Sequence, residues 1–490
     1  MVVAGRIVPV LLLGALVVRR WEQIGPYVSG LDGGNWFAIG RRLFRDGGAT
    51  VGGVYPPLIP VLLSLGQRVA DALLVAKVVG IGSFVAVIGA TYVVARRDTN
   101  RWFALSIAMT VGLANALTET VAFGGYPQNY ACAFALLAAY AFARYLAEGR
   151  RSSLLGTAAA LVGAALSHHL FFAMSCAMVA FIWVVWLTER PKRDALIART
   201  VGMSAAVTIA LACVLPTFIG LWRAGYAPAA NIAQYDLVTA FQYATHDAPF
   251  FWLGVMILGV VATACSAARR ATTIWKVQSA LLLAVLPSFL LTHEARLIPL
   301  LLIGATLAVG AALHAYWVQY GKTVRGIMPA LGMFSIPLLL WVPSDTSAIR
   351  SFAHYRVLDR SLVAAAGWLD IRHPDGRIVV RDDRRGWPVG WWFEGLTGAP
   401  IIVGSDEKYL FFPSERDRAR LASRFFAPNM STRQVADLAH RSGVTYLVFR
   451  KRDWIGWRAW ITEPDPQVRV VFDDNEYMIL AVADQPAGAA

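Results

Sequence analysis

Residues 31–60 contain the side chains that are best suited to chemistry. Asp32 stands near the start of this stretch, directly before two glycines, and Tyr55 stands near its end. An ionised carboxylate can take a proton from a hydroxyl group, and glycines leave the backbone open to a bulky substrate. Asp32 or Asn35 could instead cap a helix that we expect over 36–44. These local features leave a catalytic and a structural role open for Asp32.

Two further groups of ionisable residues stand at the ends of apolar segments. Glu119 precedes a glycine-rich turn, where it could act as a second acid or a metal ligand, or simply reach the membrane interface. His168 and His169 close another apolar segment, and neighbouring residues of a helix point to different faces. They are therefore not a ready metal-binding pair, and contact of one ring with a substrate is the alternative to a structural role.

The segment from His293 to Arg296 brings a positive charge to the start of an apolar stretch. A guanidinium group stays charged and can bind a phosphate group through two parallel hydrogen bonds. An ion pair between Arg296 and Glu294 is the structural alternative. Phosphate binding is the role that we favour for Arg296.

Two more clusters of side chains have a functional and a structural interpretation each. The aromatic residues of GWPVGWWFEG could bind a sugar ring or dock a domain on a membrane, and we favour docking. The basic residues around the first outer loop could grip a lipid phosphate, but a face turned to solvent or headgroups is the more common case. The members are Trp387, Trp391, Trp392 and Phe393 in the first cluster, and Arg19, Arg20, Arg41, Arg42 and Arg45 in the second.

The composition indicates what kind of scaffold positions these residues. Of the 490 residues, 57% are hydrophobic and 16% are charged, and the mean hydropathy is +0.52, which excludes an ordinary soluble protein. The net charge of +14 falls almost wholly in residues 1–343, with 25 Lys and Arg against 12 Asp and Glu. Basic loops on the inner side of a membrane explain this excess without nucleic-acid binding. The four cysteines lie in apolar segments without metal-ligand spacing.

About eleven apolar stretches are long enough to cross a membrane, which takes roughly 17–25 helical residues. A shorter run over 56–70 opens with two prolines, so we expect it to lie at the interface or to re-enter the membrane. The expected spans are 4–20, 72–95, 102–121, 128–146, 152–169, 170–188, 199–222, 250–268, 275–293, 297–316 and 326–343.

The distribution of charge orients these spans. With the N-terminus in the cytoplasm every inner loop is basic, and an odd number of spans places the C-terminal region outside. We therefore predict a transmembrane domain over 1–343 and a soluble extracytoplasmic α/β domain over 344–490. The expected strands are 377–381, 400–403, 445–450, 468–472 and 477–482, with a helix over 431–442 that is capped by Ser431 or Thr432 and ended by Gly443.

The order of features in the first 60 residues resembles that of a known superfamily. An apolar first span is followed by a loop that opens with Asp32 at the start of an amphipathic helix, then a glycine-rich turn, then Tyr55-Pro56-Pro57-Leu58 before the next helix. This order is similar to that of the GT-C membrane glycosyltransferases. They include protein O-mannosyltransferases, the lipid A aminoarabinose transferase and single-subunit oligosaccharyltransferases. Several members have a second acid directly after the catalytic Asp, where this chain has Gly33.

The resemblance implies a polytopic α-helical membrane protein of the GT-C type with a C-terminal extracytoplasmic α/β domain. It implies transfer of a sugar, with inversion, from a polyprenyl-phosphate-linked donor to a glycan, lipid or protein acceptor at the outer face of the plasma membrane. The expected catalytic residues are Asp32 and Glu119. The residues expected to bind the donor or its phosphate are Arg296, His293, Tyr55, His168 and His169.

The remaining expectations concern partners and rival functions. The aromatic loop 223–250 resembles the lids that cover a lipid-linked donor in this superfamily. Membrane lipids are expected partners and nucleic acid is not. No cofactor is required, and a divalent metal ion stays open. A catalytically inactive membrane scaffold and a secondary transporter of lipid-linked or envelope precursors are the alternatives.

Overall fold

The chain folds into two compact units, seen in a computed structural model that describes residues 4–28, 30–45, 55–225, 236–266, 272–320, 324–372, 376–428, 430–454, 456–462 and 466–482. The first unit comprises Met1–Gly25, Lys77–Pro216 and Gln234–His354. The second comprises Pro26–Ala76, Thr217–Ala233 and Tyr355–Ala490.

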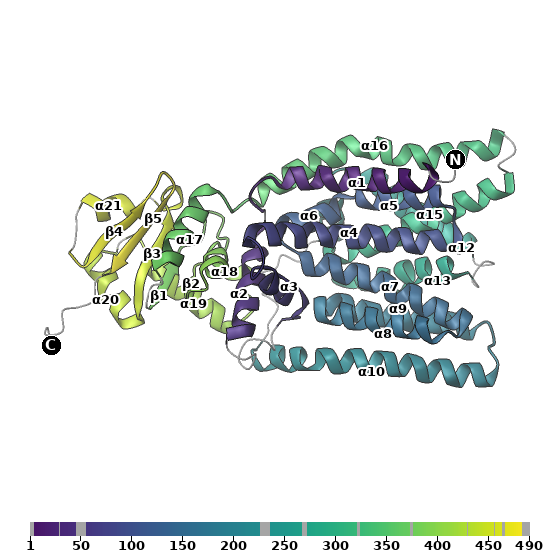
Figure 1. Cartoon of the computed structure of the whole chain (residues 1–490), viewed down its shortest axis with the longest axis horizontal. Helices are drawn as coiled ribbons and strands as arrows, with labels where there is room; N and C mark the ends of the chain where they lie inside the picture. Colours follow the sequence, from purple (N-terminus) through teal and green to yellow (C-terminus); the bar gives the residue numbers. More distant parts are fainter. Residues whose placement is uncertain are drawn as a thin grey trace. The chain divides into compact units, whose positions relative to one another are not determined.

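Helices dominate the elements of both units (Figure 1). The helices before residue 270 are α1 (Ala4–Ile24), α2 (Asp32–Arg45), α3 (Leu58–Gly66), α4 (Ala72–Asp98), α5 (Arg101–Gly112), α6 (Asn115–Phe123), α7 (Tyr126–Glu148), α8 (Arg151–Ser167), α9 (His169–Leu187), α10 (Arg193–Arg223), α11 (Leu237–Thr245) and α12 (Pro249–Cys265). Those after it are α13 (Thr273–Ser279), α14 (Val285–Thr292), α15 (Ile298–Tyr320), α16 (Val324–His354), α17 (Arg360–Arg372), α18 (Gly390–Thr397), α19 (Pro413–Phe425), α20 (Thr432–Ser442) and α21 (Trp457–Thr462).

The first unit is a bundle of apolar helices. Helices α7, α8 and α9 pack side by side, and α15 packs against α12, α13 and α16 (Figure 1). Buried Ser and Thr hydroxyls inside these helices donate to the carbonyl one turn earlier, as Thr110 does to Ser106 (2.8 Å) and Thr306 to Leu302 (2.7 Å). Their polar groups are thereby satisfied without water, as a membrane interior requires.

Six helices of the described chain are long and apolar enough to cross a membrane, or seven if the bent pair α5–α6 is one span. The six are Ala72–Asp98, Tyr126–Glu148, His169–Leu187, Arg193–Arg223, Thr273–Thr292 and Ala295–Tyr320. These helices are those of a multi-pass membrane protein. Each of the eleven predicted apolar stretches coincides with helix, but a count of eleven spans stays a prediction.

Two spans depart from regular α-helix. The axis bends by 49° between α5 and α6, inside the stretch 102–121 that we predicted as one helix. The prediction of an unbroken helix there is wrong, because apolar character continues through the bend and hydropathy does not report it. Between α13 and α14 the five residues Ala280–Ala284 form a π-helical turn, a feature often found near functional sites.

The second unit combines α2, α3 and a small sheet. Within its described residues, β1 (Arg377–Val380), β2 (Ile401–Val403), β3 (Val444–Arg450), β4 (Val468–Asp473) and β5 (Tyr477–Val482) pair in the order β2-β1-β3-β5-β4. Strands β1, β2 and β3 are parallel, whereas β5 runs antiparallel to β3 and β4. The predicted strands are confirmed to within one residue at each end.

The core of this sheet is built by the helices that follow β2. Side chains from α19 and α20, among them Phe425 and Val435, pack on Leu447 and Phe449 of β3. Helix α20 begins after Ser431, whose side chain and that of Gln434 form a capping box, and it ends at Gly443 with a φ of 63°. The predicted cap and end of this helix are confirmed. Helix α16 crosses the predicted domain boundary at 343/344, which stays a prediction.

Candidate active site

The predicted site residues divide between the two units. Asp32 and Tyr55 belong to the second unit, and Glu119, His168, His169, His293 and Arg296 belong to the first. The glycine-rich turn and Tyr226 and Tyr235 of the predicted lid lie outside the described residues.

Asp32 is the first residue of α2, at the positive end of the helix dipole. Trp36 lies one turn later, and residues four apart share a helix face. The ring of Tyr55 lies against Trp36, with 4.5 Å between ring centroids. The structure therefore brings Tyr55 to the face of α2 that carries Asp32.

The glycines after Asp32 make room for another helix of the same unit. A Cβ atom on Gly34 would lie 2.5 Å from the backbone nitrogen of Trp392, and one on Gly33 would lie 2.7 Å from the Trp392 ring. Trp392 of α18 also donates from Nε1 to the Gly30 carbonyl (2.8 Å). The bare backbone that we expected to admit a substrate is thus covered by α18, and this expectation is wrong.

The aromatic segment around Trp392 is interior rather than exposed. Trp387, Trp391, Trp392 and Phe393 are all at most 9% exposed. Trp392 packs near Phe37 of α2, with 6.3 Å between ring centroids. The predictions of a sugar-binding platform or a membrane-docking surface are therefore wrong, because these rings hold α18 to its neighbours.

Several arginines expected on a headgroup-facing surface have protein partners. Arg41 donates to Gln67 Oε1 (2.9 Å) and to the Leu396 carbonyl (2.9 Å), and Arg42 lies 3.5 Å from a carboxylate oxygen of Glu394. In the first unit, Arg19 makes a bidentate pair with Asp345, at 2.8 Å for each bond, and Arg20 is 2% exposed. These partners argue against a general role in binding lipid headgroups.

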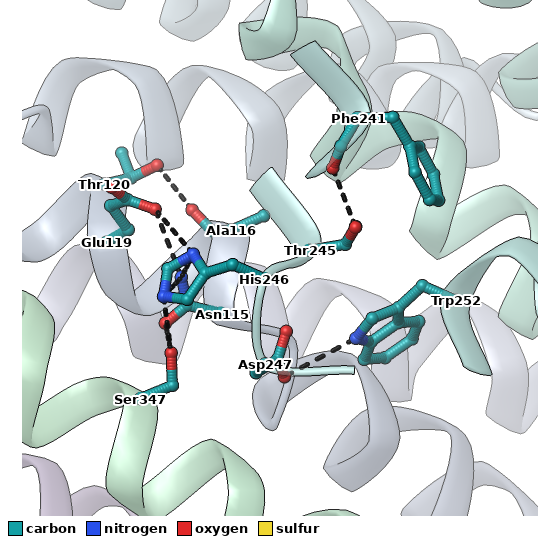
Figure 2. A network of polar contacts seen from close by, with 10 residues as sticks. All are labelled: Asn115, Ala116, Glu119, Thr120, Phe241, Thr245, His246, Asp247, Trp252 and Ser347. Carbon is teal, nitrogen blue, oxygen red and sulfur yellow. Dashed lines mark hydrogen bonds and ion pairs between the residues drawn. The ribbon is translucent and has the colours of Figure 1, made fainter. Parts of the chain in front are cut away.

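Glu119 lies in a polar network that joins three parts of the first unit (Figure 2). Its Oε2 atom accepts a hydrogen bond from Asn115 Nδ2 (3.1 Å), one turn earlier on α6, and lies 3.9 Å from Nδ1 of His246. Ser347 of α16 donates to Asn115 Oδ1 (2.8 Å) and lies 2.8 Å from Nε2 of His246. Glu119 is 7% exposed, so this buried carboxylate is surrounded by polar groups rather than by lipid-like side chains.

The local sequence explains why His246 stands at this point. Asp236 caps α11 by accepting from the Thr239 amide (2.8 Å), and the helix contacts α6 and the turn Ala295–Leu297. It ends at Thr245 because Pro249 opens the next helix and disfavours helical backbone in the residue before it. His246 therefore leaves α11 beside α6.

Asp247 adds a second carboxylate close to this network. Its Oδ2 atom accepts from Trp252 Nε1 (3.5 Å), as Figure 2 shows. Burial raises the pKa of Asp247 from 3.8 to about 6, because a charged carboxylate is poorly solvated there. The Oδ1 atom of Asp247 and the Nε atom of Arg20 are buried without a hydrogen-bond partner, and the two charges attract each other.

Three of the residues predicted to bind the donor or its phosphate, His168, His169 and Arg296, lie within electrostatic range of one another in the first unit. His168 is the extended residue between α8 and α9, and its ring stacks on that of His169 at 5.1 Å between centroids. Arg296 lies within electrostatic range of both rings. Its Nε atom is 3.3 Å from Glu294, so the ion pair that we considered as an alternative is present in the structure.

His293 ends α14 in an unusual backbone conformation. Its φ of 51° lies in the left-handed region, which costs energy for a residue other than glycine. His293 lies within electrostatic range of Asp236, the cap of α11. Helix α11 thus starts beside His293 and ends beside Glu119.

Among the described residues, no group of three or more His, Cys, Asp or Glu side chains is arranged to hold a metal ion. The roles left for Glu119 are therefore argued from its hydrogen-bond partners.

The sequence did not identify two residues of the Glu119 network. Asn115 precedes Glu119 by four positions, and this spacing could have been read as a shared helix face. Ser347 follows Asn115 by 232 positions and carries no local signal of a site. His246 falls in the aromatic loop 223–250, for which the sequence predicted the role of a lid.

Known proteins were compared with this chain through their sequences and their structures. No protein-family model and no curated protein matches the sequence. Solved structures that share the fold include the arabinofuranosyltransferase AftD from Mycobacteria (16% identity, TM-score 0.66, 97% of this chain and 40% of that one), ArnT from Cupriavidus metallidurans (15%, 0.56, 99% and 100%) and the oligosaccharyltransferase AglB from Archaeoglobus fulgidus (13%, 0.57, 89% and 69%). This chain spans about two fifths of the length of the arabinofuranosyltransferase. These neighbours are GT-C glycosyltransferases, so the predicted GT-C-like fold is confirmed.

Proposed function

We propose that the chain transfers a sugar from a polyprenyl-phosphate-linked donor to a glycan, lipid or protein acceptor. The observation that carries this proposal is the stacked pair His168 and His169 with Arg296 in electrostatic range of both, in a bundle of GT-C type. Such a group of cationic and hydrogen-bonding side chains suits a phosphate. His168 is 3% exposed and its Nδ1 atom has no hydrogen-bond partner, so it has bonding capacity for a ligand.

Two structural neighbours support the kind of donor. ArnT has been solved with undecaprenyl phosphate, and AglB with a dolichol-phosphate and an inhibitory peptide. Both ligands are phosphates on a long isoprenoid chain. The same carrier chemistry is our proposal for this protein, with Arg296, His293, His168, His169 and Tyr55 as the residues that contact the donor.

The proposed reaction is one direct displacement. The hydroxyl oxygen of the acceptor attacks the anomeric carbon while its proton passes to the carboxylate of Asp32. The bond from that carbon to the phosphate oxygen breaks, and the electron pair leaves with the phosphate, whose charge Arg296 stabilises. Attack from the side opposite the leaving group inverts the anomeric carbon. Glu119 acts as a second acid that binds a substrate hydroxyl group.

Replacing Asp32 by Asn tests the proposed base. Asp32→Asn keeps the shape but cannot accept the proton, so transfer from a lipid-linked sugar pool by the purified protein should fall about 10²–10⁴-fold. Asp71→Asn is the matched control, because Asp71 caps α4 by accepting from the amides of Leu73 and Leu74 (3.0 Å each). Near-normal transfer by a stably folded Asp32→Asn protein would assign Asp32 to capping alone.

Replacing Arg296 tests the proposed phosphate contact. Arg296→Lys keeps the charge and loses the planar fork, so the protein should bind a polyprenyl phosphate roughly tenfold more weakly, with the fold intact. Direct binding of the carrier lipid in detergent is the measurement. An unchanged affinity in Arg296→Ala would transfer the role to another cation.

We also propose that the protein lies in the plasma membrane, with a cytoplasmic N-terminus, about eleven spans and an extracytoplasmic C-terminal domain. The basic inner loops support this orientation. A cysteine introduced at an exposed position such as Arg424 should react with an impermeant maleimide in intact cells. Protection of this cysteine until the cells are opened would reverse the orientation.

A further inference from the structure

The hydrogen bonds around His246 can be assigned by counting hydrogens. The Ser347 hydroxyl has one hydrogen, which it donates to Asn115 Oδ1, so it must accept from Nε2 of His246. The Nδ1 atom of the neutral ring then has a lone pair, and Asn115 Nδ2 lies 3.2 Å from Nδ1 and 3.3 Å from Nε2. The second hydrogen of this amide goes to Glu119 Oε2.

This assignment gives each group of the network one role. Asn115 donates to Glu119 and contacts the ring of His246, and Ser347 contacts both the ring and the amide (Figure 2). His246 Nδ1 is 3.9 Å from the carboxylate, so a protonated ring would form an ion pair with Glu119. With a neutral ring, Asn115 Nδ2 is the group that donates to the carboxylate.

The cost of this arrangement argues against a purely structural role. A buried carboxylate in an apolar bundle is expensive, and apolar side chains of similar size would hold α6 to α16 at least as well. The side chain of His246 is 41% exposed, so the network reaches an accessible surface of the first unit. A costly charge that is both oriented and reachable fits a group that contacts a substrate.

We propose that Asn115, His246 and Ser347 are positioning residues, which hold the carboxylate of Glu119 in one orientation so that it accepts a hydrogen bond from a hydroxyl group of the substrate. This inference rests on the proposed function. It adds three residues that act through Glu119 and contact no substrate themselves.

Other charged groups surround His246 and belong to the same electrostatic environment. Asp247 follows it in the chain, Arg20 attracts Asp247, and Arg19 pairs with Asp345 two positions before Ser347. Helix α11 also contacts the turn that holds Arg296, next to Glu294 and His293. Variants at His246 leave all of these charges in place, so they report on the ring itself.

Two replacements of His246 test the roles of its two ring nitrogens separately. His246→Asn places an amide near the position of Nδ1 and keeps the contact with Asn115, whereas His246→Gln places one near Nε2 and keeps the contact with Ser347. His246→Gln removes Nδ1, which lies 3.2 Å from Asn115 Nδ2, so the amide that holds the Glu119 carboxylate is less well fixed. The value of kcat/KM should fall roughly tenfold, the loss expected from a misplaced group. His246→Asn should show the smaller change.

His314→Gln is the matched control, because His314 lies in the first unit outside the network and accepts from the Asn100 amide (3.2 Å). Its kcat/KM should match that of the unchanged protein. If His246→Gln does not fold, Ser347→Ala removes only a hydroxyl group and gives the same readout. An unchanged kcat/KM in a folded His246→Gln or Ser347→Ala protein would overturn the proposal.

A double-mutant cycle tests whether these residues act through Glu119. In a Glu119→Gln background, His246→Gln should cause no further loss of kcat/KM, because the carboxylate is already absent. Independent losses that multiply would overturn the positioning role. Absence of transfer from every lipid-linked sugar by the unchanged protein is a different outcome, which removes the proposed function itself.

Discussion

The helix that carries Asp32 and the helix that carries Glu119 are held by different means. Helices α2 and α18 pack closely at glycines, because Cβ atoms on Gly34 and Gly395 would clash with the facing backbone. Helix α6 meets α16 and His246 through the side chains of Asn115 and Ser347. The first contact depends on shape and the second on hydrogen bonds.

This difference determines which changes each region tolerates. Close-packed backbones leave no space for an added methyl group, but their stability does not depend on pH. A buried polar network tolerates small changes of volume, but it depends on the protonation of each member. Changes of size should therefore damage the α2–α18 contact, and changes of charge should damage the surroundings of Glu119.

The largest expected effect is a pH dependence that arises beside the Glu119 network. The folded state raises the pKa of Asp247 from 3.8 to about 6, so this group contributes stability below pH 4 that is lost as the pH rises through 6. Asp247→Asn should match the unchanged protein below pH 4 and exceed its stability above pH 6 by about 3 kcal/mol. Thermal unfolding in detergent across this range measures the difference.

Asp236 provides a control of opposite sign in the same unit. Hydrogen bonds from the Thr239 amide and hydroxyl lower the pKa of Asp236, so it contributes stability at neutral pH that is lost on acidification. Asp236→Asn should therefore gain no stability above pH 6. If the stability difference for Asp247→Asn does not vary with pH, the claim that stability near the Glu119 network depends on charge is contradicted.

A change of size at the α2–α18 contact should have the next largest effect. Gly34→Ala places a methyl group 2.5 Å from the backbone nitrogen of Trp392 and should destabilise the protein by about 1–3 kcal/mol. Gly367→Ala is the control, since Gly367 lies within α17 with nothing within 4 Å of an added Cβ. It should be neutral or stabilising by up to about 1 kcal/mol, because alanine is the better helix former. Equal melting temperatures for the two variants would contradict the close contact.

The smallest expected effect is the loss of a polar contact from α2. Arg41→Ala removes hydrogen bonds to Gln67 Oε1 and to the Leu396 carbonyl. The arginine is half-buried, so the loss should be only about 0.5–1 kcal/mol in chemical unfolding. A larger loss than that of Gly34→Ala would mean that hydrogen bonds, rather than shape, hold α2.

Local sequence patterns predicted the elements well and their contacts poorly. The strands and the capped helix α20 follow from alternation and from Ser431 and Gly443, which are features of neighbouring residues. The bend between α5 and α6 could not be seen, because both sides are apolar. The glycines after Asp32 were predicted to admit a substrate, and nothing in the residues beside them indicates that α18 occupies this place instead.

Only the ionisable residues of the candidate site could be predicted from the sequence. Glu119, His168 and Arg296 stand out because charged or titratable residues are rare in apolar segments. Asn115 and Ser347 are common residues, and their meeting depends on how helices more than two hundred residues apart pack. Hydrogen-bond networks of this kind follow from tertiary structure, so sequence spacing cannot reveal them.

The π-helical turn Ala280–Ala284 acts on the candidate site as an insertion would. A turn of this kind holds one more residue than an α-helical turn. Deleting the extra residue would restore regular helix and leave the chain that follows facing the same way. Keeping the residue in regular α-helix would instead rotate the chain that follows by about 100° and carry α14 and the turn with Arg296 to another side of the bundle. The π-helical turn therefore sets the direction in which Arg296 faces.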